Sequence, residues 1–228
     1  MRRAAEALPH RGSILDVGCG AGATSLPLAG RLGRLVGVDG QSDMLAAFLE
    51  AAATAGVAAK TVHGAWPEVA SEAAAADVVV CGHVLYNVAD LGPFVQELMR
   101  HARRRVVLEI TASHPLTWMG DLWQRFHGLE RPSEPTADDA AAAIRETGAD
   151  PRRDELSGGV DRGGGFARRE DAVALVRRRL CLPAARDPEI ESALGDRLHL
   201  RDGLWSTGPS RERLVTLWWD AAGLVPNA

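Results

Sequence analysis

The stretch Ile14-Leu15-Asp16-Val17-Gly18-Cys19-Gly20-Ala21-Gly22-Ala23-Thr24 decides the fold of this chain. Its first part is a short apolar run typical of a buried strand, and three alternating glycines follow it. Such glycines let the backbone turn sharply and let a ligand approach the main chain with no Cβ in the way. The stretch therefore predicts a strand, a ligand-binding loop and the start of a helix in an α/β sheet.

A carboxylate ends the next predicted strand, in Leu35-Val36-Gly37-Val38-Asp39. It can accept hydrogen bonds from both hydroxyls of a ribose, each worth about 1.5 to 3 kcal/mol because the acceptor is charged. An acidic residue after a strand is more often a turn former or helix cap, but the preceding glycine loop favours the ribose role for Asp39. A dinucleotide site also uses such a residue, although its fingerprint usually reads GxGxxG, whereas Gly18, Gly20 and Gly22 follow GxGxG.

Short apolar runs continue to alternate with helical stretches from Ser13 to about Ile110, which predicts repeated βα units around a parallel sheet. The predicted strands are Ser13–Val17, Arg34–Val38, Ala59–His63, Asp77–Cys81 and Arg104–Ile110. The predicted helices lie near Ala23–Arg31, Ser42–Ala55, Glu68–Ala75 and Leu91–His101. The connections are short enough for right-handed crossovers.

The alternation of strands and helices stops after Ile110, where we expect two helical insertions and the remaining strands. The expected elements are a helix at Pro115–His127, a turn at Arg131–Pro135, a helix from the N-cap Thr136 to Thr147 that stops at Gly148, a strand at Arg152–Leu156, a flexible glycine-rich loop at Gly158–Gly165, charged helices at Arg168–Leu180 and Pro188–Arg201, and a final strand at Arg213–Trp219.

Together these elements predict one α/β domain over residues 1–228. It has a seven-stranded, mostly parallel, Rossmann-like sheet with helices on both faces and helical insertions after the fifth and sixth strands. We place the core at 12–112, a lid or insertion at 113–135, a second insertion at 158–210 and the final strand at about 213–219.

The composition excludes several classes of protein. Hydrophobic residues make up 46% and charged residues 25% of the chain, which is typical of a globular protein and not of a disordered or fibrous one. The net charge of −4 gives no long-range attraction to phosphate, so we expect neither nucleic acid nor membrane as a partner. We interpret the two short arginine clusters, Arg103–Arg105 and Arg177–Arg179, as solvated ends of helices or strands. The chain has three widely spaced cysteines, Cys19, Cys81 and Cys181, and this odd number fits neither a disulfide framework nor a metal site. No signal peptide is visible either, so we expect a cytoplasmic protein.

Three segments together resemble one known family. ILDVGCGAGATSLPLA and GVDGQSDML are similar to the first two motifs of the class I S-adenosylmethionine (SAM)-dependent methyltransferases, and DVVVCGHVLYNVADLGPFVQEL is similar to their fourth-strand region. The resemblance covers about Gly12 to Glu109. It implies that SAM is the cofactor and that the chain transfers methyl groups.

The resemblance also implies a set of cofactor contacts. The glycine loop would lie along the methionine part of SAM, Asp39 would bind the ribose, and Gly40 and Met44 would pack by the adenine. Relatives often have an Asp-Ala pair where this chain has Gly64-Ala65, so Trp66 is either a stacking partner of the base or an ordinary core tryptophan. The expected cofactor-binding residues are Asp16, Gly18, Cys19, Gly20, Gly22, Asp39, Gly40, Met44, Gly64, Ala65, Trp66, Cys81 and His83.

Three side chains are candidates for catalytic contact with the methyl acceptor. His83 follows the fourth strand, at the edge where ligands of open α/β sheets bind, and a histidine can deprotonate a hydroxyl or amine near neutral pH. The alternative for His83 is a structural role or a backbone contact to SAM. His114, after the fifth strand, is the second candidate base, and Tyr86 is a candidate to orient a substrate or the methionine carboxylate. Asn87 is expected to cap the next helix.

We predict a SAM-dependent methyltransferase that acts on a small-molecule acceptor by direct methyl transfer. The fourth-strand region lacks the Asn- or Asp-Pro-Pro-aromatic signature of base-modifying relatives, and Thr111-Ala112-Ser113 lacks the Asp-Asn pair of metal-dependent relatives, so we expect no nucleic-acid substrate and no metal. The alternatives are a non-catalytic SAM-binding regulatory module and an NAD-dependent oxidoreductase, which the glycine spacing disfavours. We expect a monomer or a homodimer.

Overall fold

The computed structural model describes residues 1–156, 165–208 and 213–221 and divides the chain into two compact units. The first unit is Met1–Ile110, Ala137–Glu155 and Val215–Ala228, and the second is Thr111–Thr136 with Leu156–Leu214. The predicted insertions, 113–135 and 158–210, fall within the ranges of the second unit. The predicted flexible loop lies outside the described residues except for Gly165.

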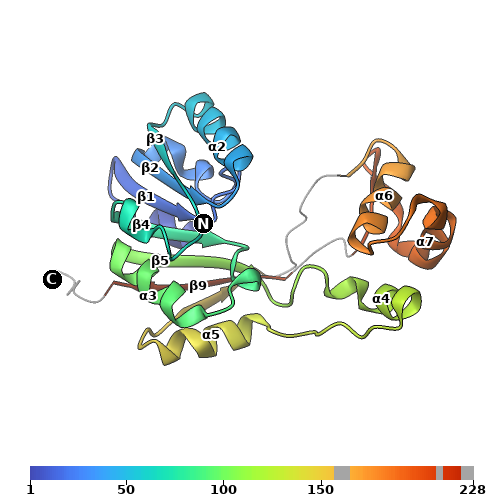
Figure 1. Ribbon diagram of the computed structural model, residues 1–228. Helices are drawn as coiled ribbons and strands as arrows, with labels where there is room; N and C mark the ends of the chain where they lie inside the picture. Colours follow the sequence, from blue (N-terminus) through green and yellow to red (C-terminus); the bar gives the residue numbers. More distant parts are fainter. Residues whose placement is uncertain (157–164, 209–212, 222–228) are drawn as a thin grey trace. The chain divides into compact units, whose positions relative to one another are not determined.

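A seven-stranded sheet forms the centre of the first unit (Figure 1). Its strands are β1 (Gly12–Val17), β2 (Leu32–Asp39), β3 (Ala59–His63), β4 (Ala76–Gly82), β5 (Ala102–Thr111), β6 (Arg152–Glu155) and β9 (Leu214–Asp220), in the order β3-β2-β1-β4-β5-β9-β6. The pairs among β1 to β5 are parallel, and β6 pairs with β9 antiparallel. The predicted seven-stranded, mostly parallel, Rossmann-like sheet is therefore confirmed.

The parallel register brings the carboxyl ends of the central strands to one edge of the sheet. Asp16 in β1 is opposite Gly37 in β2 and Val80 in β4, and Asp39 at the end of β2 is opposite His63 in β3. The loops that leave β1, β2 and β4 therefore begin side by side, at the edge where open parallel sheets bind ligands.

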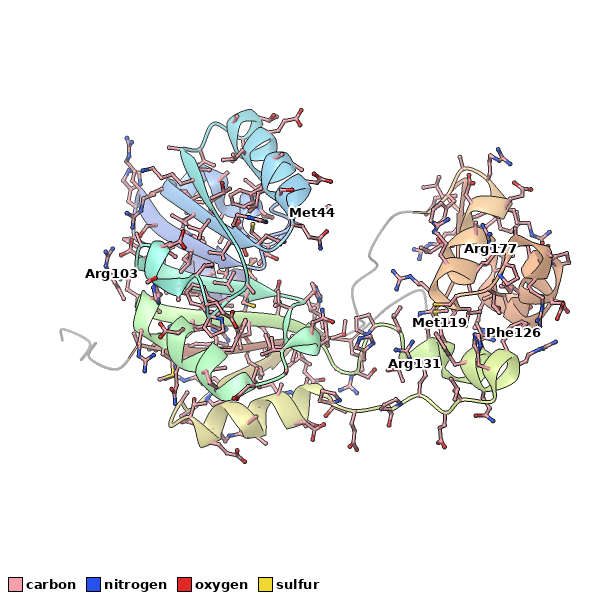
Figure 2. The ribbon with its side chains drawn as sticks, in the orientation of Figure 1. Met44, Arg103, Met119, Phe126, Arg131 and Arg177 are labelled. Carbon is pink, nitrogen blue, oxygen red and sulfur yellow. The ribbon has the colours of Figure 1, made fainter. Side chains whose placement is uncertain are left out.

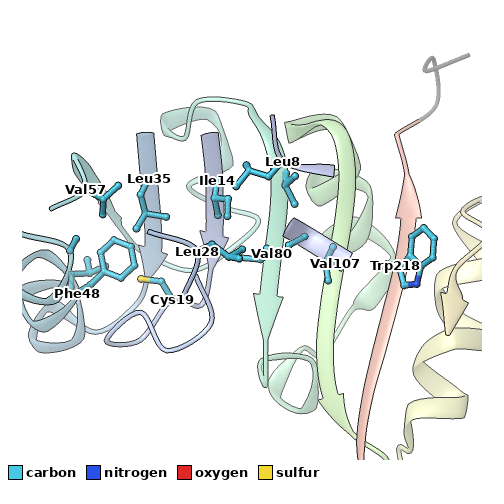
Figure 3. Close-up of a cluster of buried hydrophobic side chains, with 14 residues drawn as sticks. Leu8, Ile14, Cys19, Leu28, Leu35, Phe48, Val57, Val80, Val107 and Trp218 are labelled. Carbon is cyan, nitrogen blue, oxygen red and sulfur yellow. The ribbon is translucent and has the colours of Figure 1, made fainter. Parts of the chain in front are cut away.

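Helices cover both faces of the sheet. The helices α1 (Arg2–Ala7) and α2 (Ser42–Thr54) join β1, β2, β4 and β5 in one buried cluster (Figure 3). Its members include Ala4, Ile14, Leu35, Phe48, Val80 and Val107. The helix α3 (Leu91–His101) packs against β4, and α5 (Ala137–Glu146) packs against α3. The buried residues of α3 are not members of this cluster, as expected for a helix on the other face of the sheet.

Two predicted helices of the first unit were wrong. The stretch Ala23–Arg31 contains only the 3₁₀ helix η1 (Leu26–Arg31), because Pro27 lacks an N–H and is tolerated only in the first turn. Glu68–Ala75 contains only η2 (Ala70–Glu72). Two of its carbonyls are occupied by other elements: Ala70 O accepts from His101 Nε2 at 2.9 Å, and Ala75 O accepts from Arg34 Nη2 at 2.9 Å. Tertiary hydrogen bonds thus override the helix propensity of the alanines.

The second unit has a hydrophobic core of its own. Its elements are η4 (Thr117–Met119), α4 (Gly120–His127), α6 (Arg169–Arg179), η5 (Ala184–Arg186), α7 (Asp187–Leu194), η6 (Gly195–Arg197), β7 (His199–Arg201) and β8 (Leu204–Ser206). Met119, Leu122, Val176 and Ile190 are among its buried residues. The predicted helix Pro188–Arg201 was wrong in its second half, because α7 ends at Leu194 before Gly195, where φ is 52°, and β7 pairs with β8. Among the described residues, no helix is long and apolar enough to cross a membrane.

Three arginines surround Trp218 in β9, the strand next to the edge strand β6 of the first unit. The guanidinium carbons of Arg3, Arg105 and Arg152 lie 4.7, 4.2 and 4.6 Å from its ring centroid. Arg3 also forms an ion pair with Asp154 in β6. These contacts join α1, β5, β6 and β9, and each is worth about 0.5 to 2 kcal/mol depending on solvent exposure.

We predict that Phe48→Ala lowers the free energy of unfolding by about 3 to 5 kcal/mol, because Phe48 has no exposed surface and fills the core between α2 and the sheet. The matched control is Leu49→Ala, because Leu49 is the next residue of α2 and is 40% exposed. Its expected effect is below about 1 kcal/mol. Urea denaturation of the two variants measures both values, and equal losses would contradict the described packing of α2.

Candidate functional site

The glycine loop closes over the end of β2. The N–H groups of Gly18 and Cys19 donate to Val38 O at 2.8 and 3.0 Å, and the Gly22 N–H donates to Cys19 O at 2.8 Å. Gly18 has a φ of 69°, and a Cβ there would lie 2.2 Å from Val84 Cγ2. The path of the loop therefore requires glycine at this position.

The Asp39 carboxylate holds the same loop from β2. Its Oδ2 accepts from the Gly20 N–H at 2.9 Å, and its Oδ1 accepts from the Gln41 N–H at 2.9 Å. A Cβ on Gly20 would meet no atom within 4 Å, so space is open beside the loop. A carboxylate has about four lone-pair sites, so Asp39 can hold the loop and still accept from ribose hydroxyls.

Asp16 is fully buried at the end of β1. Its Oδ2 accepts from Ser25 Oγ at 2.6 Å, whereas its Oδ1 has no hydrogen-bond partner among the described residues. Burial raises the pKa of Asp16 to about 7; the bond from Ser25 opposes the rise, and the charge of Asp39 adds to it. An unpaired buried acceptor is unfavourable, so a donor from a ligand or water at Oδ1 would stabilise the site.

The two cysteines of the predicted site are core residues. Cys19 is 4% exposed, and a Cβ on Gly37 would lie 2.7 Å from its Sγ, so Gly37 makes room for the thiol. Cys81 is fully buried in β4. Burial raises the pKa of both thiols, which leaves them protonated and unreactive. The backbone of Cys19, and not its side chain, therefore shapes the loop.

A cleft of about 770 Å³ opens at the carboxyl edge of β1, β2 and β4. Seven of the predicted cofactor residues line it: Gly18, Asp39, Gly40, Gly64, Ala65, Trp66 and His83. Six others do not: Asp16, Cys19, Gly20, Gly22, Met44 and Cys81. Met44 lies on α2 (Figure 2) and is 39% exposed. The structure thus brings the loop, the end of β2 and the segment after β3 together around one cleft.

Trp66 is held mainly as a core residue. It is 9% exposed, its Nε1 donates to Phe94 O at 3.2 Å, and its ring meets the His101 ring edge-on at a centroid distance of 5.0 Å. The polar edge of the indole is therefore already satisfied by α3. This geometry favours the core role of Trp66 over stacking on a base.

His83 and Tyr86 lie together beyond β4. His83 has a φ of 61°, which is uncommon outside glycine, and its N–H donates to Glu109 O in β5 at 2.7 Å. The His83 and Tyr86 rings are stacked with centroids 6.5 Å apart. His83 lines the cleft and is exposed to solvent.

His114 belongs to the second unit and has a fixed tautomer. Its Nδ1 accepts from the Leu116 N–H at 3.1 Å, so in the neutral ring the proton is on Nε2. Burial, with the nearby charges of Arg131 and Arg179, lowers the pKa of His114 below its usual value. His114 is therefore a neutral donor at neutral pH, which is a poor arrangement for a general base.

The cleft also contains residues that the sequence analysis missed. Asn87 was expected to cap α3, but the cap is Asp90, whose side chain accepts from the Gly92 N–H at 3.1 Å, and both residues line the cleft. Glu68 and Phe94 line it as well. The position of Asp90 directly before Leu91 is a capping signal that the sequence contains. Among the described residues, no three His, Cys, Asp or Glu side chains gather as metal ligands.

Comparison with known proteins identifies related sequences. Residues 14–105 match the family model described as a methyltransferase domain. A ubiquinone biosynthesis O-methyltransferase of Azorhizobium caulinodans is 30% identical over 146 residues, which cover 58% of this chain and 58% of that protein. The match thus spans less than two thirds of the relative.

Solved structures share the fold at low identity. A methyltransferase-like protein of Bacillus halodurans C-125 matches with a TM-score of 0.61 and 13% identity, over 97% of this chain and 96% of that chain. The YcgJ protein of Bacillus subtilis matches with a TM-score of 0.59 and 16% identity, over 96% of each chain. Magnesium protoporphyrin IX methyltransferase of Synechocystis PCC 6803, with bound S-adenosylhomocysteine (SAH), matches with a TM-score of 0.54 and 21% identity, over 68% of this chain and 72% of that chain.

The raised pKa of Asp16 predicts a pH dependence of stability. Asp16 keeps its proton to about pH 7 in the folded protein but loses it near pH 3.8 when unfolded, so between these values the folded state binds more protons and its stability falls as pH rises. Asp16→Asn removes this titration. We therefore compare the free energy of unfolding of the wild type with that of Asp16→Asn at each pH. As pH rises from about 4 to about 7, we expect the wild-type value minus the variant value to fall by up to about 1.4 kcal/mol per pH unit. Urea denaturation from about pH 5 to about pH 8 tests it; a constant difference would contradict the burial of Asp16.

Proposed function

We propose that the chain is a class I SAM-dependent methyltransferase that transfers the methyl group of SAM to a small-molecule acceptor; the match of residues 14–105 to a methyltransferase domain supports this proposal. The acidic lining of the cleft carries this proposal. Asp39, Glu68 and Asp90 line it, and no Lys or Arg of the described residues does. SAM carries a positive sulfonium and an ammonium group, whereas a dinucleotide carries a negative pyrophosphate, so the charge of the cleft favours SAM over NAD.

The backbone donors of the loop support the same choice. The N–H groups of Gly18, Cys19 and Gly20 donate within the protein, to Val38 O and to the Asp39 carboxylate. A pyrophosphate site needs such N–H groups to point at the ligand from the start of a helix, and the segment after this loop begins as a turn and continues as a 3₁₀ helix. The loop therefore suits a ligand that donates hydrogen bonds better than one that accepts them.

The residues around the cleft fit the parts of SAM. We infer that Asp39 binds the ribose and that Gly64 and Ala65 lie by the base, since all three line the cleft. Asp16 is fully buried behind the loop and does not line the cleft. Bound SAM supplies a methyl group on a positively charged sulfur, which is transferred by displacement. The task of the chain is to orient the acceptor and exclude water, and orientation contributes up to about 7 to 11 kcal/mol.

Among the candidate catalytic residues, the geometry supports His83 over His114. His83 lines the cleft beside Tyr86 and is placed to take a proton from an acceptor, whereas the Nδ1 of His114 already accepts the Leu116 N–H. We assign Tyr86 to orient the acceptor or the methionine carboxylate. The acceptor is a small molecule on this proposal, which the name of the A. caulinodans relative, an O-methyltransferase of ubiquinone biosynthesis, supports.

We predict that the protein binds SAH and that Asp39→Ala weakens this binding tenfold or more, which corresponds to about 1.4 kcal/mol. The loss follows from the ribose bonds and from release of the Gly20 N–H. Isothermal titration calorimetry of wild type and variant measures it, with NAD as the competing ligand and thermal denaturation to verify folding.

The matched control is Asp43→Ala, because Asp43 is an exposed carboxylate in the first turn of α2 that does not line the cleft. It should leave the affinity for SAH unchanged. The proposed function fails if wild type does not bind SAH, if NAD displaces SAH, or if Asp39→Ala and Asp43→Ala bind SAH equally well.

A further inference from the structure

Residues 65–70 form a turn after β3 that leads into η2, and the turn lies within the first unit. Four residues of this turn line the cleft: Ala65, Trp66, Pro67 and Glu68. Two backbone hydrogen bonds close the turn, because the Val69 N–H donates to Ala65 O at 3.1 Å and the Ala70 N–H donates to Pro67 O at 3.0 Å. The position of Ala70 is therefore transmitted to residues that line the cleft.

The helix α3 holds this turn at two points. Trp66 Nε1 donates to Phe94 O at 3.2 Å, and His101 Nε2 donates to Ala70 O at 2.9 Å. Phe94 and His101 are seven residues apart in α3, which is about two helical turns, so both lie on one face of the helix. The 65–70 turn is thus attached to α3 near its start and at its end.

The His101 side chain is itself fixed by its surroundings. Its Nδ1 lies 2.8 Å from Glu97 O, in the preceding turn of α3. Its ring meets the Trp66 ring edge-on, with the centroids 5.0 Å apart. The side chain is only 14% exposed, so water has little access to its bond with Ala70 O. A ring held in this way can restrict the movement of the turn.

We propose that His101 is a positioning residue of the cofactor site, because it holds the 65–70 turn in the shape that accepts the base of SAM. His101 does not line the cleft, so it acts on the ligand through Ala70 and the turn. Without this bond the turn samples other positions, and the apparent affinity falls with the fraction of molecules whose turn still fits the ligand. This inference rests on the proposed function, since it concerns binding of the proposed cofactor.

Two substitutions separate the two contacts of the His101 ring. In His101→Gln the amide nitrogen reaches about as far from the backbone as Nε2 and can donate to Ala70 O. In His101→Asn it reaches about as far as Nδ1 and can donate only to Glu97 O. Calorimetric titration with SAH should give the wild-type affinity for His101→Gln and about fivefold weaker binding for His101→Asn, as expected from the loss of one hydrogen bond.

The matched control is Arg100→Gln, because Arg100 is the preceding residue of α3, is exposed and forms an ion pair with Glu97. This variant should bind SAH like the wild type. Thermal denaturation verifies that each variant is folded at the temperature of the titration, so that lower stability alone does not change the affinity.

The inference is overturned if His101→Asn binds SAH as tightly as the wild type. It is also overturned if His101→Gln and His101→Asn weaken binding equally, since the effect would then not depend on the bond to Ala70. The two proposals fail separately. If the wild type does not bind SAH, the proposed function is rejected, whereas if the wild type binds SAH and the two His101 variants bind it alike, only the role of His101 is rejected.

Discussion

The end of β2 is the constraint on which the cofactor site depends. Val38 O accepts two N–H groups of the glycine loop, and the next residue, Asp39, accepts a third from Gly20. The parallel register places Val38 beside Val17, so the loop that leaves β1 meets β2 at once. Only a chain with glycines at these positions can follow so tight a path, and a register shift of one residue would separate Asp39 from the loop.

The contact between the glycine loop and the end of β2 also explains how Asp16 is accommodated inside the protein. Its carboxyl group is fully buried and receives one hydrogen bond, from Ser25, while the charge of Asp39 acts on it from the neighbouring strand. Two carboxyl groups so close together favour a proton on the buried one. The site thus combines a charged acceptor at the cleft with a second acid whose ionisation depends on what approaches the loop. Such a pair is poorly suited to an anionic ligand and well suited to a cationic one.

The sequence predicted what local rules determine and missed what tertiary contacts determine. The strands, the glycine loop and Asp39 follow from apolar runs and from glycine spacing, so they could be placed in advance. The role of Trp66 could not, because it depends on the distant carbonyl of Phe94. The helix expected at Glu68–Ala75 failed for the same reason, since Arg34 and His101 occupy its carbonyls. The tautomer of His114 likewise depends on a turn that residue pattern alone does not fix.

The charge of the cleft in the first unit favours a ligand of positive charge. Among the described residues it is lined by carboxylates and by no arginine or lysine, although arginine is abundant in the chain. Opposite charges attract and like charges repel, so a methyl donor that carries a sulfonium and an ammonium group suits these carboxylates. A dinucleotide with its negative pyrophosphate would be disfavoured by the same charges, so the cleft can discriminate between the two ligands by charge.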